Sequence, residues 1–506
     1  MEKGQILEVK IEDMSSEGQG IGKADGFAVF VPSAVIGDVV RVKLTKVKKN
    51  YGFSRIEEVV EESPYRSGEF DCDSFDEGCG GCQYGGLEYG AQLVLKARQV
   101  GDKLRRIAKI ESPVVRDIIG MSAEDNGGNG CFRYRNKAQF SVSAGGIITK
   151  KGGIVENLGK PTVGFFHAGS RDVADGCSCL IQSAAAVAAA AALQRFMEED
   201  NITAWDPRWK KGLMRRMVVK TGFESGEVMV ILEINGKGIP NVQKLIGMLD
   251  DAVYDVGYSL ESVVLNDKRR DGSDKMQVVA GRASINDSLG HLSFEISPES
   301  FYQVNPVQMK RLYDKVREYC EFEAYGQRKP VILDLYCGVG SIGLYCADSA
   351  EYIVGIESVQ QAVLDANRNA VINGIVNARY ICGKAEAILP AYVDYGLDAD
   401  DKDEKNEAAE RLEKLPDIDD ELAEMIRSAD IVILDPPRAG CRPELLEAAV
   451  RTGAGKIVYV SCNPATLARD VKLLGEMGYE FKEATPVDMF PHTSGIEAVA
   501  KLIRRS

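Results

Sequence analysis

Long apolar runs, histidines and an excess of positive charge are what this sequence lacks. No apolar stretch approaches the roughly 18 residues that a membrane span needs. The first residues, MEKGQILEVKIED, contain no apolar core of a signal peptide. We therefore expect a cytoplasmic protein without membrane contact. The chain has only three histidines and a formal net charge of −14, which at first disfavours a nucleic-acid partner.

The distribution of charge weakens that objection. Residues 398–424 carry thirteen acidic and four basic side chains, so this segment supplies much of the negative charge. We expect it to be a solvated insertion, partly helical or disordered. Residues 41–55 (RVKLTKVKKNYGFSR), by contrast, carry six bases and no acid. A local basic stripe matters more to a phosphate backbone than the total charge does.

The length of 506 residues predicts about three domains. Residues 1–60 contain five short alternating runs, typical of a small OB-like barrel. Such a barrel either binds RNA, with Tyr51 and Phe53 beside the basic stripe, or is a module without ligand; we favour RNA. Residues 61–288 predict a mostly antiparallel α+β domain with helices at 88–110 and 183–199. Residues 289–506 alternate strands and helices, which predicts a doubly wound α/β sheet.

The α/β domain begins with the sequence VILDLYCGVGSIGL, an apolar strand followed by a glycine-rich turn. Such turns let the backbone approach a ligand at the carboxyl end of the strand. One strand later Glu357 can accept both ribose hydroxyls of an adenosine. The alternative is a dinucleotide, but the turn is not GxGxxG and Asp334 at its mouth would repel a pyrophosphate. S-Adenosylmethionine, with its cationic amino acid end, fits better.

A fourth apolar strand ends in Asp435, which is followed by two prolines. The prolines fix an extended turn without N–H donors, so Asp435 is held at the edge where the donor is expected. Either the aspartate is a capping residue of a rigid strand exit, or it contacts the donor or the substrate base. Turns with an acid or amide followed by two prolines also occur in enzymes that methylate exocyclic amino groups. This motif alone therefore leaves two chemistries open, methylation of an amino group and methylation of a ring carbon.

Cys462 distinguishes these two chemistries. It follows the strand KIVYVS and precedes Asn463 and Pro464, a natural cap and first residue of a helix. A helix N-terminus favours thiolate. An amino group needs no such nucleophile, whereas carbon 5 of a pyrimidine becomes nucleophilic only after a thiolate adds to carbon 6. The adduct must then lose its carbon-5 proton to a base; Glu497 is the favoured candidate and His492 its alternative.

Three cysteines lie in a glycine-containing loop, Cys72, Cys79 and Cys82. A fourth would complete a tetrahedral thiolate set, and the segment CSCLIQ offers Cys177 or Cys179. The spacing alone fits zinc and an iron–sulfur cluster about equally.

The chain resembles the RNA uracil-5-methyltransferase family in a series of motifs. In order along the chain, they are SPESFYQVN, DLYCGVG, Ile356-Glu357, DPPRAG, VSCNPATLARD and DMFPHT. The resemblance implies a Rossmann-like class I methyltransferase domain with Cys462 as nucleophile and Glu497 as base. It also implies a set of donor-site residues: Gln303, Tyr336, Ser341 at the turn, Glu357 and Asp435. Two departures are HTSGIE, where the family often has HTHHVE, and Lys384, which replaces a frequent acid or amide.

The four-cysteine members of this family carry a [4Fe–4S] cluster, and the resemblance implies Cys72, Cys79, Cys82 and Cys179 as its ligands. Because a fourth thiolate would leave no iron open, we expect the cluster to be structural. It also favours RNA contacts for Arg133, Arg135 and Lys137. Members with both a TRAM-like barrel and four cysteines mostly act on 23S ribosomal RNA, which we take as the expected substrate of a monomeric enzyme. The alternatives are a tRNA uracil-5-methyltransferase, an amino-group nucleobase methyltransferase and a non-catalytic RNA-binding factor.

Overall fold

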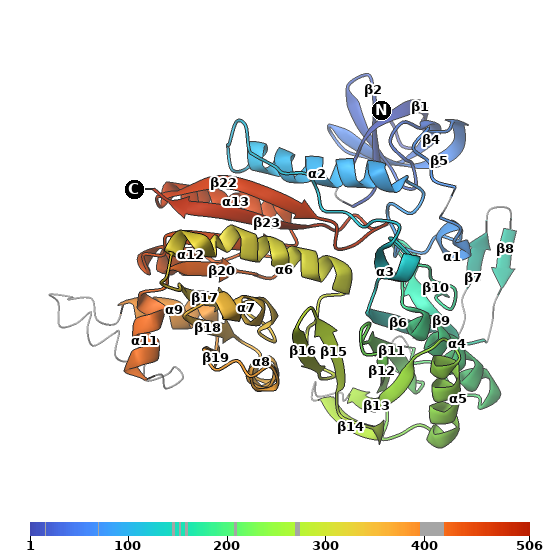
Figure 1. Ribbon diagram of the computed structural model, residues 1–506. Coiled ribbons are helices and arrows are strands. Elements are labelled where there is room, and N and C mark those ends of the chain that lie inside the picture. Colours follow the sequence, from blue (N-terminus) through green and yellow to red (C-terminus); the bar gives the residue numbers. More distant parts are fainter. Residues whose placement is uncertain are drawn as a thin grey trace.

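A computed structural model describes residues 1–15, 17–68, 70–143, 147–150, 153–156, 160–206, 210–268, 274–394 and 419–505 (Figure 1). The first unit is a closed barrel in the order β1-β2-β3-β5-β4. Its strands are β1 (Ile6–Met14), β2 (Gly20–Ala24), β3 (Phe27–Val31), β4 (Val39–Val47) and β5 (Tyr51–Glu61). Alternate residues such as Val9, Ile11 and Val29 fill its interior, because successive side chains of a strand point to opposite faces. The predicted five-stranded barrel is confirmed.

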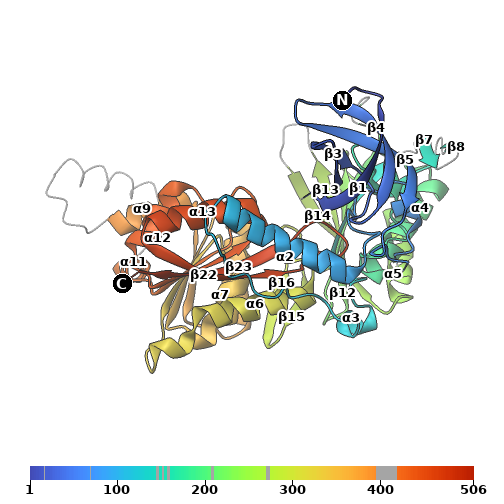
Figure 2. The same ribbon diagram turned by 90° about the horizontal axis from the view of Figure 1, so that it is seen from above.

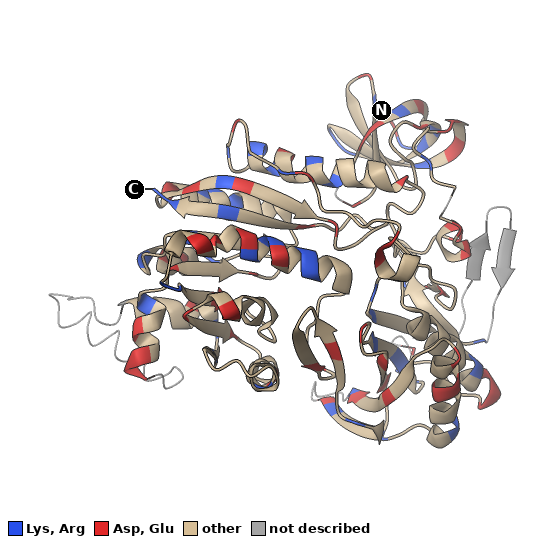
Figure 3. Ribbon diagram, in the orientation of Figure 1, with Lys and Arg blue, Asp and Glu red and all other residues tan. Residues whose placement is uncertain are grey.

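The basic stripe on the barrel is partly neutralised. Arg41 forms ion pairs with Glu8 and Glu58, and Arg55 pairs with Glu57, so both signs of charge appear on the barrel in Figure 3. Phe30 and Phe53 pack around the exposed Tyr51, with ring centroids 5.7 and 5.8 Å from the tyrosine ring. The aromatic side chains predicted beside the stripe therefore form one cluster on the barrel surface.

The central unit is built on a seven-stranded sheet, in the order β10-β9-β6-β11-β12-β13-β14, in which only β12 and β13 pair in parallel. Its helices are α1 (Asp73–Asp76), α2 (Tyr89–Arg106), α3 (Asp125–Gly128), α4 (Ala184–Glu199) and α5 (Val242–Tyr254); its strands are β6 (Lys137–Ser143), β7 (Ile147–Lys150), β8 (Gly153–Glu156), β9 (Thr162–Phe166), β10 (Val173–Asp175), β11 (Met214–Thr221), β12 (Glu227–Ile234), β13 (Ser259–Lys268), β14 (Asp274–Gly281), β15 (Ile285–Leu289) and β16 (Leu292–Ile296). The predicted helices correspond to α2 and α4. Sequence reasoning missed α5, which connects the parallel pair.

The third unit is a second seven-stranded sheet, in the order β19-β18-β17-β20-β21-β23-β22, with only β23 antiparallel to its neighbours. Its helices are α6 (Pro306–Cys320), α7 (Ser341–Cys346), α8 (Gln360–Ile372), α9 (Ala385–Asp394), α11 (Asp420–Arg427), α12 (Pro443–Arg451) and α13 (Pro464–Glu476); its strands are β17 (Val331–Leu335), β18 (Tyr352–Glu357), β19 (Ala378–Cys382), β20 (Ile431–Leu434), β21 (Lys456–Ser461), β22 (Tyr479–Val487) and β23 (Glu497–Arg504). The predicted doubly wound sheet is confirmed. Most of the acidic segment 398–424 lies outside the described residues; its end forms α11.

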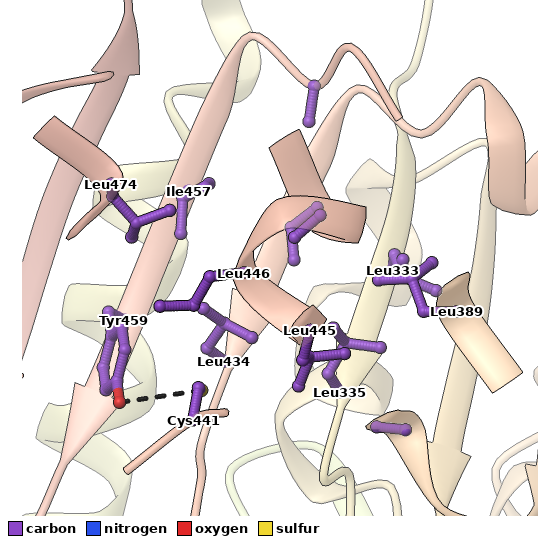
Figure 4. Close-up of a cluster of buried hydrophobic side chains, with 14 of the residues drawn as sticks. Leu333, Leu335, Leu389, Leu434, Cys441, Leu445, Leu446, Ile457, Tyr459 and Leu474 are labelled. Atoms are coloured by element: carbon purple, nitrogen blue, oxygen red, sulfur yellow. Dashed lines mark hydrogen bonds between the residues drawn. The ribbon is translucent and has the colours of Figure 1, made fainter. Parts of the chain in front are cut away.

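Close packing on one face of this sheet holds the strand ends in place. Leu335, Leu434 and Tyr459 of three parallel strands meet α12 and α13 in the cluster of Figure 4. The Tyr459 hydroxyl donates to Asp470 at 2.6 Å, and the Cys441 thiol lies 3.7 Å from the same hydroxyl. Cys441 is a buried core residue.

Helix α2 connects all three units (Figures 1 and 2). Leu95 packs into the barrel core, whereas Val100 and Leu104 belong to the core under the third sheet. Residues 114–119 continue from α2 along the outer edge of that sheet, where Val115 and Ile119 form β-bridges to β22. The segment 61–288, predicted to be one domain, therefore contributes α2 to the cores of the other two units.

Candidate active site

The carboxyl ends of four parallel strands meet at one edge of the third sheet. Leu335 of β17 pairs with Leu434 of β20 on one side and with Ile356 of β18 on the other. Leu434 pairs in turn with Tyr459 of β21. The residues that follow these positions therefore come together, as ligand-binding residues do in open α/β sheets.

A cavity of about 830 Å³ opens at this edge. It is lined by six of the predicted site residues: Gln303, Tyr336, Glu357, Asp435, Cys462 and Glu497. Ser341 lies in a smaller adjoining cavity, which Gln303, Tyr336 and Asp435 also line. There its hydroxyl is hydrogen-bonded to that of Tyr313 at 2.7 Å. The structure thus gathers the predicted donor-site and catalytic residues around two cavities that share part of their lining.

The glycine-rich turn lies above a buried carboxylate. Asp334 is fully buried and accepts a hydrogen bond from the Gly343 amide at 3.0 Å. A Cβ at position 343 would come within 2.9 Å of that carboxylate, so glycine is required there. The expectation that Asp334 itself faces the donor is not met, because it lines neither cavity. It instead holds the first turn of α7, the helix that follows the glycine-rich turn.

Glu357 is oriented by the turn beside it. Its carboxylate accepts from the Gly338 amide at 3.2 Å and from the Val359 amide at 2.9 Å. Tyr336 has a left-handed backbone, with φ of 63°, and its hydroxyl donates to Glu386 at 2.8 Å. Such strain in a non-glycine residue is often found at ligand sites.

Cys462 occupies the turn between β21 and α13. The Asn463 side chain accepts from the Ala465 amide at 3.1 Å and Pro464 begins the helix, so the predicted cap and helix start are confirmed. The same asparagine donates to the Arg438 carbonyl at 3.0 Å. The loop carrying the thiol is thereby tied to the loop that follows Asp435.

The electrostatic surroundings of the thiol differ from the prediction. Burial, followed by the Glu497 and Asp435 carboxylates, raises the pKa of Cys462 to about 11, while Arg438 lowers it. The helix N-terminus was expected to favour thiolate, and the raised pKa contradicts this prediction. Burial of the thiol is the main cause of this rise, and two carboxylates from distant parts of the chain add to it.

Glu497 lies next to Cys462 because of strand register. Ser461 of β21 pairs with Ala498 of β23, so the residue after the first and the residue before the second are neighbours across the ladder. Glu497 is buried, and one of its carboxyl oxygens has no hydrogen-bond partner among the described residues. Burial and the nearby Asp435 raise its pKa well above 4.5. Burial likewise raises the pKa of Asp435 to about 7.

His492, the alternative base, lies outside this cavity. Its ring stacks on Phe132 with centroids 4.7 Å apart and lies 4.8 Å from the Phe70 ring. Burial lowers its pKa to about 3. Its Nε2 lies 3.1 Å from the Cys131 sulfur. The structure therefore brings Glu497, and not His492, to the thiol.

The four predicted cysteine ligands line a second cavity of about 420 Å³; they are Cys72, Cys79, Cys82 and Cys179. Burial, and then Cys179, Cys79 and Cys72 in that order, raise the pKa of Cys82. The Cys177 sulfur lies elsewhere, 3.9 Å from the Val163 carbonyl and 3.7 Å from Gln194 on α4. Across the described ranges, no group of three or more His, Cys, Asp or Glu side chains is arranged to hold a metal ion.

Three basic residues that precede or begin strand β6 lie beside this cysteine cavity. Arg133 donates to the Cys179 carbonyl at 2.5 Å, and Arg135 and Lys137 line the cavity. Burial lowers the pKa of Lys137, and Arg135 adds to the effect. These three side chains, expected to contact RNA, thus border the cysteines.

Sequence reasoning missed several residues that line the catalytic cavity; four of them are Phe301, Arg438, Arg442 and Phe490. All but Arg442 lie inside motifs that it had singled out, and this was the available signal. Phe301 is 58% exposed and lines the cysteine cavity as well. The segment 301–304 is therefore a common wall of the two cavities.

Comparisons with known proteins assign the chain to a family. Residues 1–56 match the TRAM domain model, and residues 273–505 match the model of tRNA (Uracil-5-)-methyltransferase. An uncharacterized RNA methyltransferase of Halalkalibacterium halodurans is 37% identical over 99% of this chain and 97% of its own length. The chain belongs to the RNA uracil-5-methyltransferase family. A second relative, from Caldanaerobacter subterraneus, is also 37% identical, over 99% of this chain and 98% of its own.

Solved structures agree with membership of the RNA uracil-5-methyltransferase family. The tRNA (uracil-54, C5)-methyltransferase of Pyrococcus abyssi, in complex with S-adenosyl-L-homocysteine, has a TM-score of 0.69 and 26% identity. The match covers 98% of this chain and 100% of that one. The protein is an S-adenosylmethionine-dependent RNA methyltransferase, not the non-catalytic factor that the sequence left open. No helix in the described part of the chain is long and apolar enough to span a membrane.

Proposed function

We propose that the protein methylates carbon 5 of uridine in RNA, through a transient bond between Cys462 and carbon 6. The observation that carries this proposal is the meeting of Cys462, Glu497 and Asp435 in one cavity with the glycine turn and Glu357. An amino-group methyltransferase would use Asp435 without needing a thiol and a second buried carboxyl side by side.

The reaction follows from the nature of carbon 5. The Cys462 thiolate adds to carbon 6, and the electron pair of the ring double bond makes carbon 5 an enolate carbon. Carbon 5 takes the methyl group from the sulfonium, which leaves as the neutral thioether. Glu497 then accepts the carbon-5 proton, the double bond forms again and the thiolate leaves. Carbon 6 is reachable only when the uracil has left the base stack.

The donor would lie over the glycine turn, with Glu357 toward the ribose and Gln303, Tyr336, Ser341 and Asp435 around it. The carboxyls in and beneath the cavity have raised pKa values, about 7 for both Asp334 and Asp435. A cationic sulfonium and ammonium would favour their ionised forms. The same positive charge would lower the pKa of Cys462 and so help to generate the thiolate.

The cysteine cavity supports a [4Fe–4S] cluster held by Cys72, Cys79, Cys82 and Cys179. All four cysteines are among the residues that line one cavity; thiolates suit zinc as well as iron, and the resemblance to the four-cysteine members of the family favours the cluster. Arg133, Arg135 and Lys137 would balance the negative charge of bound thiolates. In our proposal the cluster is structural: it shapes the wall of residues 301–304 and takes no part in methyl transfer.

We propose 23S ribosomal RNA as the substrate, because the chain combines the TRAM barrel with the four-cysteine pattern. Transfer RNA is the second candidate, favoured by the likeness to the Pyrococcus abyssi tRNA enzyme. Mass mapping of both RNA classes from a deletion strain decides between them. Loss of a methyl group from a ribosomal uridine supports the first candidate, and loss from a transfer RNA uridine supports the second.

The chemistry is tested by trapping. RNA with 5-fluorouridine at the target lacks the carbon-5 proton, so the methylated adduct cannot release the thiol. We expect a covalent protein–RNA conjugate through Cys462 in the presence of donor, and none with Cys462→Ala. Methyl transfer that persists in Cys462→Ala would refute the mechanism and favour amino-group methylation.

A further inference from the structure

The connection between β22 and β23 forms part of the catalytic cavity. It runs from Asp488 to Ile496, and its Phe490 lines the cavity together with Cys462 and Glu497. Its first five residues, Asp488 to His492, which we call the β22–β23 wall, include Asp488 with no exposed surface and His492 with 4%. This wall is a buried irregular segment, so its backbone polar groups need partners from elsewhere.

Helix α2 supplies several of these partners. Lys96 is fully buried, and its Nζ donates to the Asp488 carboxylate at 2.5 Å and to the Phe490 carbonyl at 3.0 Å. One turn earlier, the Gln92 side chain accepts from the His492 amide at 2.9 Å. Gln92 and Lys96, on one face of α2, therefore form hydrogen bonds with both ends of the wall.

Other residues add further contacts, among them the Thr493 hydroxyl, which donates to the Phe490 carbonyl at 2.9 Å. The Tyr134 hydroxyl donates to the Pro491 carbonyl at 3.0 Å. From the start of α6, Asn305 donates to the Met489 carbonyl at 3.3 Å and Gln308 to the Asp488 carbonyl at 3.0 Å. His492 has φ of 65°, a conformation that non-glycine residues keep only where the surroundings enforce it. The wall is thus held in one conformation by buried polar groups.

A buried ion pair is a weak means of stabilising a fold, because the cost of desolvation offsets the attraction. Burial lowers the pKa of Lys96, and Asp488 acts against this. The Lys96 ammonium group has three N–H donors, and it uses them to hold the Asp488 carboxylate and the Phe490 carbonyl, two residues apart, in fixed positions. This arrangement points to positioning more than to stability.

We infer that Lys96 is a positioning residue that, through Asp488 and the Phe490 carbonyl, sets the place of the Phe490 ring in the catalytic cavity. The inference rests on the proposed function, since it takes the cavity to be the site of uracil methylation. Because Leu95 packs in the barrel core and Val100 under the methyltransferase sheet, α2 fixes this wall relative to both units.

The test is a double-mutant cycle on the rate of covalent trapping. Full-length wild type, Lys96→Met, Phe490→Ala and the double variant are mixed with saturating 5-fluorouridine RNA and donor, and the single-turnover rate of conjugate formation is measured. RNA affinity is measured separately. We expect each single variant to lose about tenfold to a hundredfold in rate, with RNA affinity unchanged. The double variant should be no slower than the slower single one, because both changes act through one contact.

Lys456→Met is the matched control. Lys456 is also a buried lysine that donates to a carbonyl, that of Cys320 at 2.6 Å, but it lies at the far end of β21. Any loss in trapping rate caused by Lys456→Met should multiply with the loss caused by Phe490→Ala, because the two changes are independent. Lys96→Met/Asp488→Asn, which removes both charges, serves if the single variant does not fold. The inference would be overturned if the rate losses of Lys96→Met and Phe490→Ala multiplied in the double variant. It would also be overturned if Lys96→Met formed the conjugate at the wild-type rate. Absence of conjugate with wild type would instead refute the proposed function.

Discussion

In the protein without bound donor, the Asp435 carboxyl makes the free energy of unfolding depend on pH. Burial raises the pKa of this group from 3.8 to about 7. Between these two values the unfolded chain has lost the proton that the folded protein still binds, so the free energy of unfolding falls as pH rises. Above pH 7 both states are ionised and the effect is constant. At 1.36 kcal/mol per pH unit, the upper limit of the loss is about 4 kcal/mol.

The substitution Asp435→Asn removes this titration and keeps the shape of the side chain. Relative to wild type, the variant should gain about 2 kcal/mol in free energy of unfolding between pH 5.5 and pH 8.0, the part of the loss that falls in this window. Asp435 also raises the pKa of Asp334, and relief of that repulsion acts in the same direction. The variant should nevertheless lose methyl transfer.

Urea unfolding at the two pH values measures this gain. Asp250→Asn, an exposed position on α5, controls for the change in net charge and should show no pH-dependent gain. S-Adenosylmethionine should stabilise wild type at pH 8.0 more than S-adenosylhomocysteine does, since only the former carries the sulfonium charge. This difference should shrink in Asp435→Asn. An advantage of the variant that is equal at both pH values, or smaller at pH 8.0, would refute the reasoning.

Two further predictions concern the base and the cysteines. Glu497→Gln should form the bond to carbon 6 and transfer the methyl group but fail to remove the proton, so labelled methyl groups should accumulate in a protein–RNA conjugate on ordinary uridine RNA; rapid release of methylated RNA would contradict this. Cys179→Ser should lose most of the iron and sulfide measured in anaerobically prepared protein, whereas Cys177→Ser should keep them. Zinc without iron in wild type would exclude the cluster.

Most of the architecture could be predicted from the sequence because the apolar patterns are local. The barrel strands and the strands β17 to β21 are short apolar runs bounded by turn residues. β22 was missed, since its sequence YEFKEATPV mixes charges with a proline, which is tolerated at the edge position that it occupies. α5 was missed although Leu245, Leu249 and Val253 follow a helical spacing and are buried.

The electrostatics of the site could not be predicted in the same way. The helix at Asn463 argued for thiolate, but burial in the folded protein, together with Glu497 and Asp435 from other parts of the chain, raises the pKa of Cys462. The role of His492 was likewise undecided in sequence, because its partner Gln92 lies 400 residues away along the chain. Local motifs identify the reacting groups, and only the fold shows which charges surround them.

The pairing of β21 with β23 has a consequence for how such enzymes diversify. The proposed nucleophile Cys462 and the proposed base Glu497 are set side by side by the register of backbone hydrogen bonds between β21 and β23, so their separation does not depend on the barrel or on the cysteine loop. RNA-contacting parts can therefore be exchanged or lengthened while the reacting atoms stay in place. A graft of another barrel onto this catalytic sheet would change which RNA is chosen, and the chemistry at carbon 5 would survive it.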